Sequence, residues 1–293
     1  MTDDVIDALV RSRAWLATAG MRTDASARHV LQALLGVWVC DRAIDEESPE
    51  RRALAARAAE LLDAEDFDPY EYDPKLLFVC LQVSWRDGGG PTALARFAKE
   101  LAASLAPLPL IPSRHAGVAA ILHELGLLRT RPLDVDEADV DELLRGGVEA
   151  VRAACSSVAA ATHFGARQSP VRFSGLRRTL PVLFLQSLRA YDLDTAAMLL
   201  RASRYLRMPR ADRIEEGIAF LVDQQKPDGR FGYFAVESSA LVESQEVAAF
   251  DELLTLSLPV TSTCAWALAE LVSGGPALFE RRPVKEEPWS MVS

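Results

Sequence analysis

Two carboxylic acids and a hydroxyl group stand close together in the segment Asp192-Leu193-Asp194-Thr195. A carboxyl group in an apolar cavity has a raised pKa, and a neighbouring hydrogen-bonding group can hold its proton in a reactive position. The segment therefore suits general acid catalysis, with Asp192, Asp194 and Thr195 as the candidate catalytic residues. The same pattern suits the N-terminus of a helix, where such side chains accept backbone hydrogen bonds, so a structural role stays open.

Three arginines farther along the same predicted helix bear on this choice, namely Arg201, Arg204 and Arg207. An arginine beside a carboxylate lowers its pKa and turns a proton donor into a structural anchor. A catalytic Asp194 is therefore expected to face a cavity, to lack an arginine partner and to keep its proton near neutral pH.

The histidines and cysteines do not form a recognisable metal-binding pattern. The four cysteines are far apart and no pair has CxxC spacing, so we expect buried free thiols. His123 begins a segment that resembles HExxH, but Leu127 stands where the second histidine would be. We expect His123 to be a polar-face or hydrogen-bonded core residue, and we predict neither a metal ion nor a cofactor.

A second acidic pair, Asp41 and Asp45, lies one helical turn apart, as a magnesium–diphosphate site would need. Arg42 occupies the place of the second aspartate of a DDxxD motif, and no partner motif follows downstream. We therefore expect a solvated helix end here.

The composition excludes several classes of partner. The chain has 293 residues, 49% of them hydrophobic, and a formal net charge of −10. Such a charge argues against nucleic acid and against an anionic membrane surface. The first residues are acidic where a signal peptide would be basic, and we find no apolar run near the roughly 20 residues of a membrane span. We expect a cytoplasmic protein without a membrane span. Arginine accounts for 28 of the 32 basic residues, which suggests a high-GC bacterial genome.

Apolar residues recur with the spacing of a buried helix face from one end of the chain to the other, as at Leu31, Leu34, Leu35 and Trp38. We count roughly eleven or twelve such helices and no alternating strand pattern, so we predict an all-α fold. The connectors are too short for a flexible interdomain linker. We therefore predict a single domain over residues 1–293, with residues 275–293 as a mobile tail.

The most informative stretch for the fold runs from Gly217 to Phe234 and reads GIAFLVDQQKPDGRFGYF. A helix should end near Gln225, after which Pro-Asp-Gly turns the chain and Gly229 takes a positive φ. Gln224 or Gln225 can bind the free carbonyls of the helix end and the next turn. Phe231 should fold back over the helix end and be largely buried.

This stretch resembles one repeat of the terpene-cyclase and prenyltransferase (squalene-cyclase-type) superfamily. The matching residues are Phe220, Leu221, Gln224 or Gln225, Asp228, Gly229, Arg230, Phe231 and Gly232. Phe231 stands where the family usually has tryptophan. The resemblance covers about residues 191–272, and the segment from Leu258 to Val272 looks like the start of the next repeat, in which threonine-rich residues open an inner helix. It implies an α/α toroid, a barrel of alternating inner and outer helices around a central cavity.

The resemblance also implies a range of functions. Class II cyclases of this fold protonate an alkene or epoxide through an Asp-x-Asp-Asp or Asp-x-Asp-Thr-Thr motif, which Asp192, Asp194 and Thr195 resemble, with Ala196 in the last place. Protein prenyltransferases of this fold hold zinc with Asp, Cys and His, and we find no such trio. Aromatic residues make up only 7% of the chain, which disfavours a cavity built to stabilise carbocations.

We therefore expect a non-catalytic or degenerate toroid in bacterial specialised metabolism. It would bind an apolar small molecule, a peptide or a partner biosynthetic enzyme. The alternative is a class II cyclase-like enzyme that protonates an isoprenoid through the segment from Asp192 to Thr195.

Overall fold

The computed structural model describes residues 2–63, 67–86, 92–129, 140–169, 172–209, 212–232 and 248–273. Within these ranges the chain forms twelve α-helices and one short 3-10 helix, and it forms no β-strand. The helices hold more than half of the chain, which confirms the all-α prediction. The predicted tail, residues 275–293, lies outside the described ranges.

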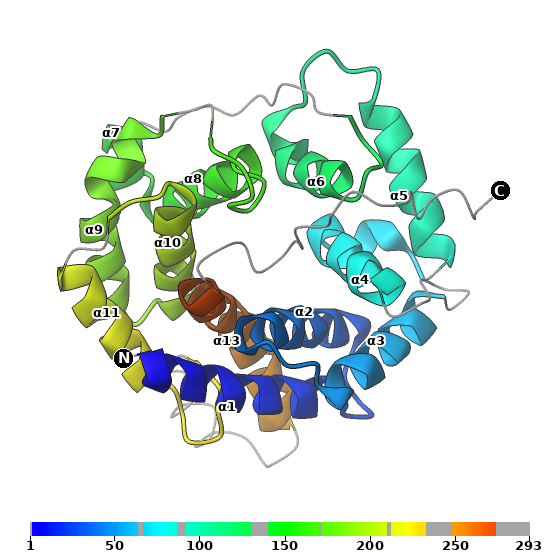
Figure 1. Ribbon diagram of the computed structural model, residues 1–293, viewed down its shortest axis with the longest axis horizontal. Helices are drawn as coiled ribbons and strands as arrows, with labels where there is room; N and C mark the ends of the chain where they lie inside the picture. Colours follow the sequence, from blue (N-terminus) through cyan, green and yellow to red (C-terminus); the bar gives the residue numbers. More distant parts are fainter. Residues whose placement is uncertain are drawn as a thin grey trace.

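The helices are labelled as in Figure 1. In chain order they are α1 (Thr2–Gly20), α2 (Ala27–Ile44), α3 (Pro49–Leu62), η1 (Pro69–Glu71), α4 (Pro74–Arg86), α5 (Thr92–Leu105), α6 (Ser113–Glu124), α7 (Val140–Arg145), α8 (Gly147–Ala161), α9 (Ser174–Arg189), α10 (Leu193–Tyr205), α11 (Asp212–Asp223) and α13 (Ala248–Ser273).

Six helices contact one another in chain order, which are α2, α4, α6, α8, α10 and α13, and α13 returns to contact α2. We call these six the inner series, because they lie nearer the middle of the view in Figure 1. The helices α1, α3, α5, α7 and α9 lie farther out, and each packs on at least one helix of the inner series. The helix α11 packs on α9 and on α1, so the last of these outer helices contacts the first.

Local sequence explains where the first helices begin and end. The side chain of Ser26 accepts a hydrogen bond from the backbone N–H of His29 and so caps α2, and Ser48 caps α3 in the same way, just before Pro49. Asp45 ends α2 in a left-handed conformation, with φ of 53°. Between these caps α2 is buried along most of its length, because α1, α3, α4 and α13 surround it.

Gln225, Gly229 and Phe231 form a clasp that joins the end of α11 to α1 and α13. Gln225 Nε2 lies 2.8 Å from the carbonyl oxygen of Ala8 and 2.9 Å from Ser12 Oγ, and its Oε1 accepts a hydrogen bond from Arg11 Nε at 2.8 Å. Of the two glutamines that the sequence left open, Gln225 is therefore the one that makes these bonds.

The turn of the clasp requires glycine. Gly229 has φ of +98°, and a Cβ atom there would lie 2.2 Å from the carbonyl oxygen of Arg11. Phe231 is fully buried, and its backbone N–H donates to Thr261 Oγ1 of α13 at 2.9 Å. The predicted turn at Gly229 and the predicted burial of Phe231 are both confirmed.

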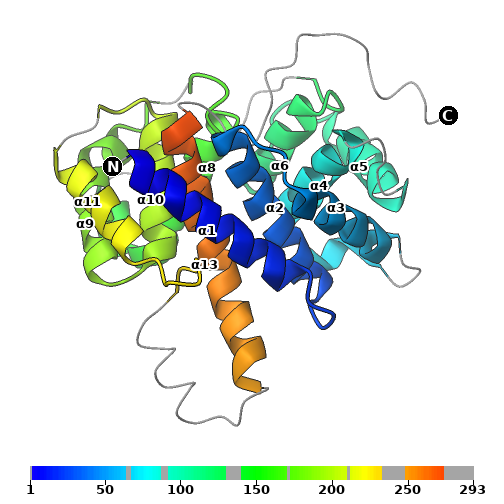
Figure 2. The ribbon, with the colours of Figure 1, turned by 60° about the horizontal axis from the view of Figure 1, so that its bottom comes forward.

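The threonine-rich segment does not open a helix, and that prediction is wrong. The helix α13 already begins at Ala248, so Thr261 and Thr263 lie well inside it. The residues that precede them include alanine, leucine and glutamate, which favour helix and extend it toward the N-terminus. Figure 2 shows the first part of α13 extending beyond the other helices.

The sequence pattern also missed one apolar segment. Within α13, residues Leu254–Ser273 are long and apolar enough to cross a membrane by length and composition. In the structure, 67% of this segment is buried against the rest of the protein. A core helix passes the same test of length and composition, so the segment is weak evidence for a membrane span.

Candidate functional site

A cavity of about 650 Å³ lies among the helices of the inner series. Each of the six inner helices contributes to its wall, and Asp73 and Phe164 border it from the connecting segments. The wall is made of both apolar residues and residues with hydroxyl groups. The apolar ones include Leu35, Leu76, Val79, Val118, Ile121, Met198 and Trp266, and the hydroxyl-bearing ones include Ser113, Ser156, Ser157, Ser262 and Thr263.

The candidate catalytic residues meet an arginine from a neighbouring helix, and we call the four together the Arg152 cluster. Asp192 caps α10 by accepting a hydrogen bond from the backbone N–H of Thr195 at 3.1 Å. Arg152 of α8 donates from Nε to Thr195 Oγ1 at 3.0 Å. Its guanidinium also lies 3.1 Å from Asp194 and 3.6 Å from Asp192. The helix-capping interpretation therefore holds for Asp192.

Asp194 borders the cavity, as the catalytic interpretation requires. Burial raises the pKa of this carboxyl group and the nearby Asp192 adds to the rise, while a hydrogen bond with Thr263 and the charges of Arg152 and Arg201 oppose it. A catalytic Asp194 was expected to lack an arginine partner, but Asp194 pairs with Arg152. Asp194 therefore combines a raised pKa, as a general acid has, with the arginine contact of a structural anchor.

Of the three arginines that the sequence singled out, Arg201 pairs with a residue of α13. Its guanidinium lies 3.6 Å from Glu270 and 3.4 Å from the centre of the Trp266 ring. Tyr205 and Trp266 each donate a hydrogen bond of 2.7 Å to Glu270. This network ties α10 to α13 and leaves a neutralised arginine on the cavity wall.

All four cysteines are buried free thiols, as predicted. Cys155 lies on the cavity wall, and burial raises its pKa to about 12 although the charge of Arg201 opposes the rise. The thiol therefore stays protonated near neutral pH and behaves as a small apolar group rather than as a nucleophile.

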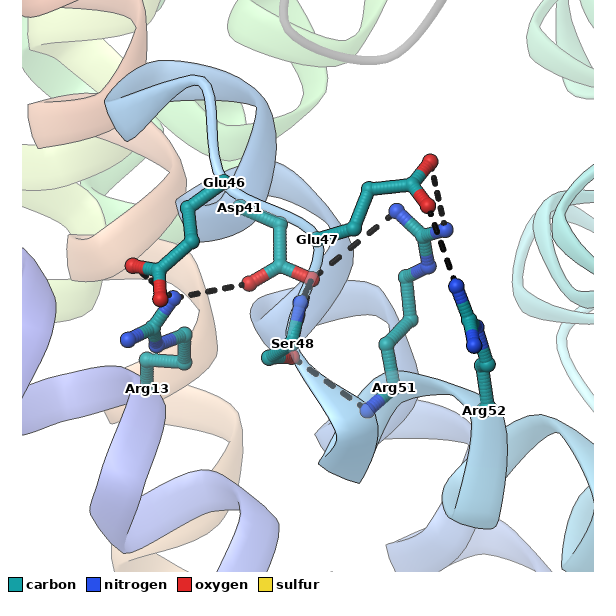
Figure 3. A network of polar contacts seen from close by, with 7 residues as sticks. All are labelled: Arg13, Asp41, Glu46, Glu47, Ser48, Arg51 and Arg52. Carbon is teal, nitrogen blue, oxygen red and sulfur yellow. Dashed lines mark hydrogen bonds and ion pairs between the residues drawn. The ribbon is translucent and has the colours of Figure 1, made fainter.

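The second acidic pair takes a structural role. Asp41 is buried, which corrects the expected solvated helix end, whereas Asp45 is exposed. Figure 3 shows the Asp41 carboxylate between Arg13 of α1 and Arg51 of α3, at 3.2 Å and 3.8 Å. It also accepts hydrogen bonds from the backbone N–H and the hydroxyl of Ser48. These contacts hold α1, α2 and α3 together, and the sequence could not show them because the partners come from other helices.

Two histidines and a glutamate lie together where α6 and α8 end. The possible ligand atoms of His123, Glu124 and His163 lie within 4.8 Å of one another. His163 Nδ1 is 2.8 Å from Glu124 Oε1, and Arg167 contacts both Glu124 and His123 Nε2. Burial would raise the pKa of Glu124, but the hydrogen bond with His163 and the nearby positive charges outweigh it, so the pKa is lowered. Sequence reasoning missed this group because His163 lies far from His123 along the chain.

The chain was compared with family models, curated proteins and solved structures, and none of them matches it.

Proposed function

We propose that the protein is an α/α toroid whose central cavity binds a neutral, largely apolar small molecule, and that it does so without catalysis. The closed order of contacts in the inner series, with the outer helices packed around it, supports the toroid. The size of the cavity supports the ligand, because about 650 Å³ falls within the range of roughly 300–1,000 Å³ that holds drug-sized molecules.

The charges on the wall favour a neutral ligand. Arg201 pairs with Glu270, and Asp194 pairs with Arg152, so each of the two charged wall residues of α10 has a partner of opposite charge. A diphosphate would need cations that are not already paired with carboxylates. The hydroxyl groups of the wall can instead bind an alcohol or a carbonyl group of an otherwise apolar ligand.

The observation that carries the non-catalytic proposal is the ion pair of 3.1 Å between Arg152 and Asp194. A general acid must deliver a proton to its substrate and become an anion only then. An arginine at ion-pair distance favours the carboxylate anion before any substrate binds, so it opposes the protonated state from which a general acid must start. Asp194 then acts as an anchor that holds α10 against α8.

One observation favours the second candidate, a class II cyclase-like enzyme. Asp194 borders the cavity, and its pKa is raised by burial despite the arginines. In that case Asp194 would donate the proton, Asp192 and Thr195 would hold the segment in place, and Arg152 would have to move or tolerate a protonated partner.

Ligand binding tests the first proposal. Calorimetric titration with the neutral alcohol geranylgeraniol should show binding, and geranylgeranyl diphosphate should bind no more tightly than the alcohol. The substitution Ser156→Trp, on the cavity wall, should abolish binding. Val148→Trp is the matched control, because Val148 is an exposed residue of the same helix outside the cavity wall, and it should leave binding unchanged.

Turnover tests the second candidate. The protein is incubated with geranylgeranyl diphosphate, and the products are examined by mass spectrometry for cyclised hydrocarbons. No cyclised product from the wild type supports the binding function. Cyclised product from the wild type that disappears with Asp194→Asn would replace our proposal with the enzyme.

A further inference from the structure

The group of two histidines and one glutamate between α6 and α8 has the ligand set of a metal centre, and none of its three residues lines the cavity described above. His123 and Glu124 are adjacent at the end of α6, and His163 follows the end of α8. Two imidazoles and a carboxylate form an open zinc site in several enzymes and the facial triad of non-haem iron sites. We propose that His123, Glu124 and His163 bind a divalent transition-metal ion.

A backbone contact fixes the orientation of the first histidine. His123 Nδ1 lies 2.9 Å from the carbonyl oxygen of Leu128. A carbonyl oxygen only accepts hydrogen bonds, so Nδ1 carries the proton and Nε2 presents its lone pair. This arrangement is the usual outer-shell support of a metal-bound histidine, in which the second ring nitrogen donates to a carbonyl or carboxylate. Nε2 points toward the group, because it is the atom that Arg167 contacts.

The second histidine is directed by an unusual backbone. His163 has φ of 49° and Phe164 has φ of 53°, two successive left-handed residues other than glycine. Such conformations cost free energy and persist only where surrounding contacts hold them. They bring the His163 ring edge-on to the His123 ring, with 5.2 Å between the ring centres, and bring His163 Nδ1 to Glu124. Phe164 then borders the cavity, so the metal site adjoins its wall.

Arg167 is the cation that a metal ion would replace. Its Nε lies 3.3 Å from Glu124 Oε1, and its guanidinium also contacts His123 Nε2. It therefore occupies two atoms that would otherwise bind the metal ion. The Arg167 side chain is 44% exposed and can swing into solvent at little cost. The ion would be held by the two imidazoles and the carboxylate, and water would fill its remaining positions.

The experiment titrates the full-length protein, stripped with EDTA, with Zn²⁺ against a chromophoric chelator, and uses Co²⁺ as a visible-absorption probe of coordination. We expect one equivalent to bind. His163→Ala and His123→Ala should each weaken binding by at least about tenfold, since even outer-shell changes cost 10- to 100-fold. The matched control is His29→Ala on α2, which should bind like the wild type.

Arg167→Ala gives a result that a merely structural role of the group would not produce. Removing the competing guanidinium should tighten Zn²⁺ binding by roughly two- to fivefold, the factor that loss of an exposed ion pair supplies. Circular dichroism checks that each variant folds, and Glu124→Gln replaces any that does not, because its amide oxygen keeps the hydrogen bond but is a poor ligand. Failure of the wild type to bind Zn²⁺ and Co²⁺, or equal binding by the histidine variants, would overturn the proposal. Neither result depends on whether the cavity binds an alcohol.

Discussion

The clasp and the Arg152 cluster each join side chains of different helices, and they differ in what their polar groups face. In the clasp, Gln225 binds atoms of α1 and Phe231 is fully buried, so every group is used to join helices. In the Arg152 cluster, Asp194 also binds an arginine of another helix, but it borders a cavity. We infer that a polar group enclosed by other side chains has a structural role, whereas a polar group that borders a cavity is a candidate for function.

The comparison predicts its largest effect at Phe231. Replacement by alanine removes a fully buried aromatic ring, and the free energy of unfolding should fall by about 3 kcal/mol, at the low end of measured losses for such deletions. Urea denaturation followed by circular dichroism measures this loss. A loss below about 0.5 kcal/mol would mean that the ring contributes little and that the clasp is not structural.

The next effect is expected at Gln225. The substitution Gln225→Ala removes the hydrogen bonds to the Ala8 carbonyl, to Ser12 and to Arg11, so we expect a loss of about 1–3 kcal/mol. Gln224→Ala is the matched control, because the neighbouring glutamine makes its hydrogen bonds to Phe220 and Leu221 through its backbone N–H. Equal losses for the two variants would show that the contact with α1 is not the source of the stability.

A smaller effect on stability is expected at Asp194. The substitution Asp194→Asn breaks the pair with Arg152, whose side chain is 33% exposed, so the free energy of unfolding should change by less than about 1 kcal/mol. The same urea titration measures it. A loss as large as that of Phe231→Ala would show that Asp194 has a structural role like that of the clasp, and that the two regions do not differ.

The smallest effect is a dependence on pH. The folded protein holds the Asp194 proton more tightly than the unfolded chain, since burial raises the pKa above its ordinary value of 3.8. In the window from 3.8 up to the raised pKa, the folded state therefore binds more protons, and this contribution to stability falls as pH rises. The stability of the wild type minus that of Asp194→Asn should decrease across the window and then level off. A difference that grows with pH would mean that Arg152 dominates and lowers the pKa.

The sequence predicted what depends on near neighbours in the chain. The helix periodicity, the turn at Gly229 and the burial of Phe231 follow from local residue types, and all three are present. The choice between Gln224 and Gln225 could not be made, because it depends on which side chain reaches α1. The start of α13 was misplaced because helix-favouring residues continue upstream of the threonines.

The candidate site was predicted only in part, for the same reason. The position of Asp194 on a cavity wall agrees with its motif, but its partner Arg152 comes from a helix 42 residues away from it in the chain (194 minus 152). His163 and Asp41 likewise take their roles from residues of other helices. Local patterns carry no information on such contacts, because they depend on how the helices pack.

The clasp also has a consequence for how the protein is made. Gln225 binds Ala8 across a separation of 217 residues, so α1 must wait for a partner that is synthesised long after it. At about 5–20 residues per second, a ribosome needs roughly 10 to 40 s to cover that distance. During this time the face of α1 that later packs against α13 is exposed on the nascent chain, where a chaperone can bind it. Slow translation of the region before residue 225 should therefore lower the yield of folded protein more than slow translation after α13.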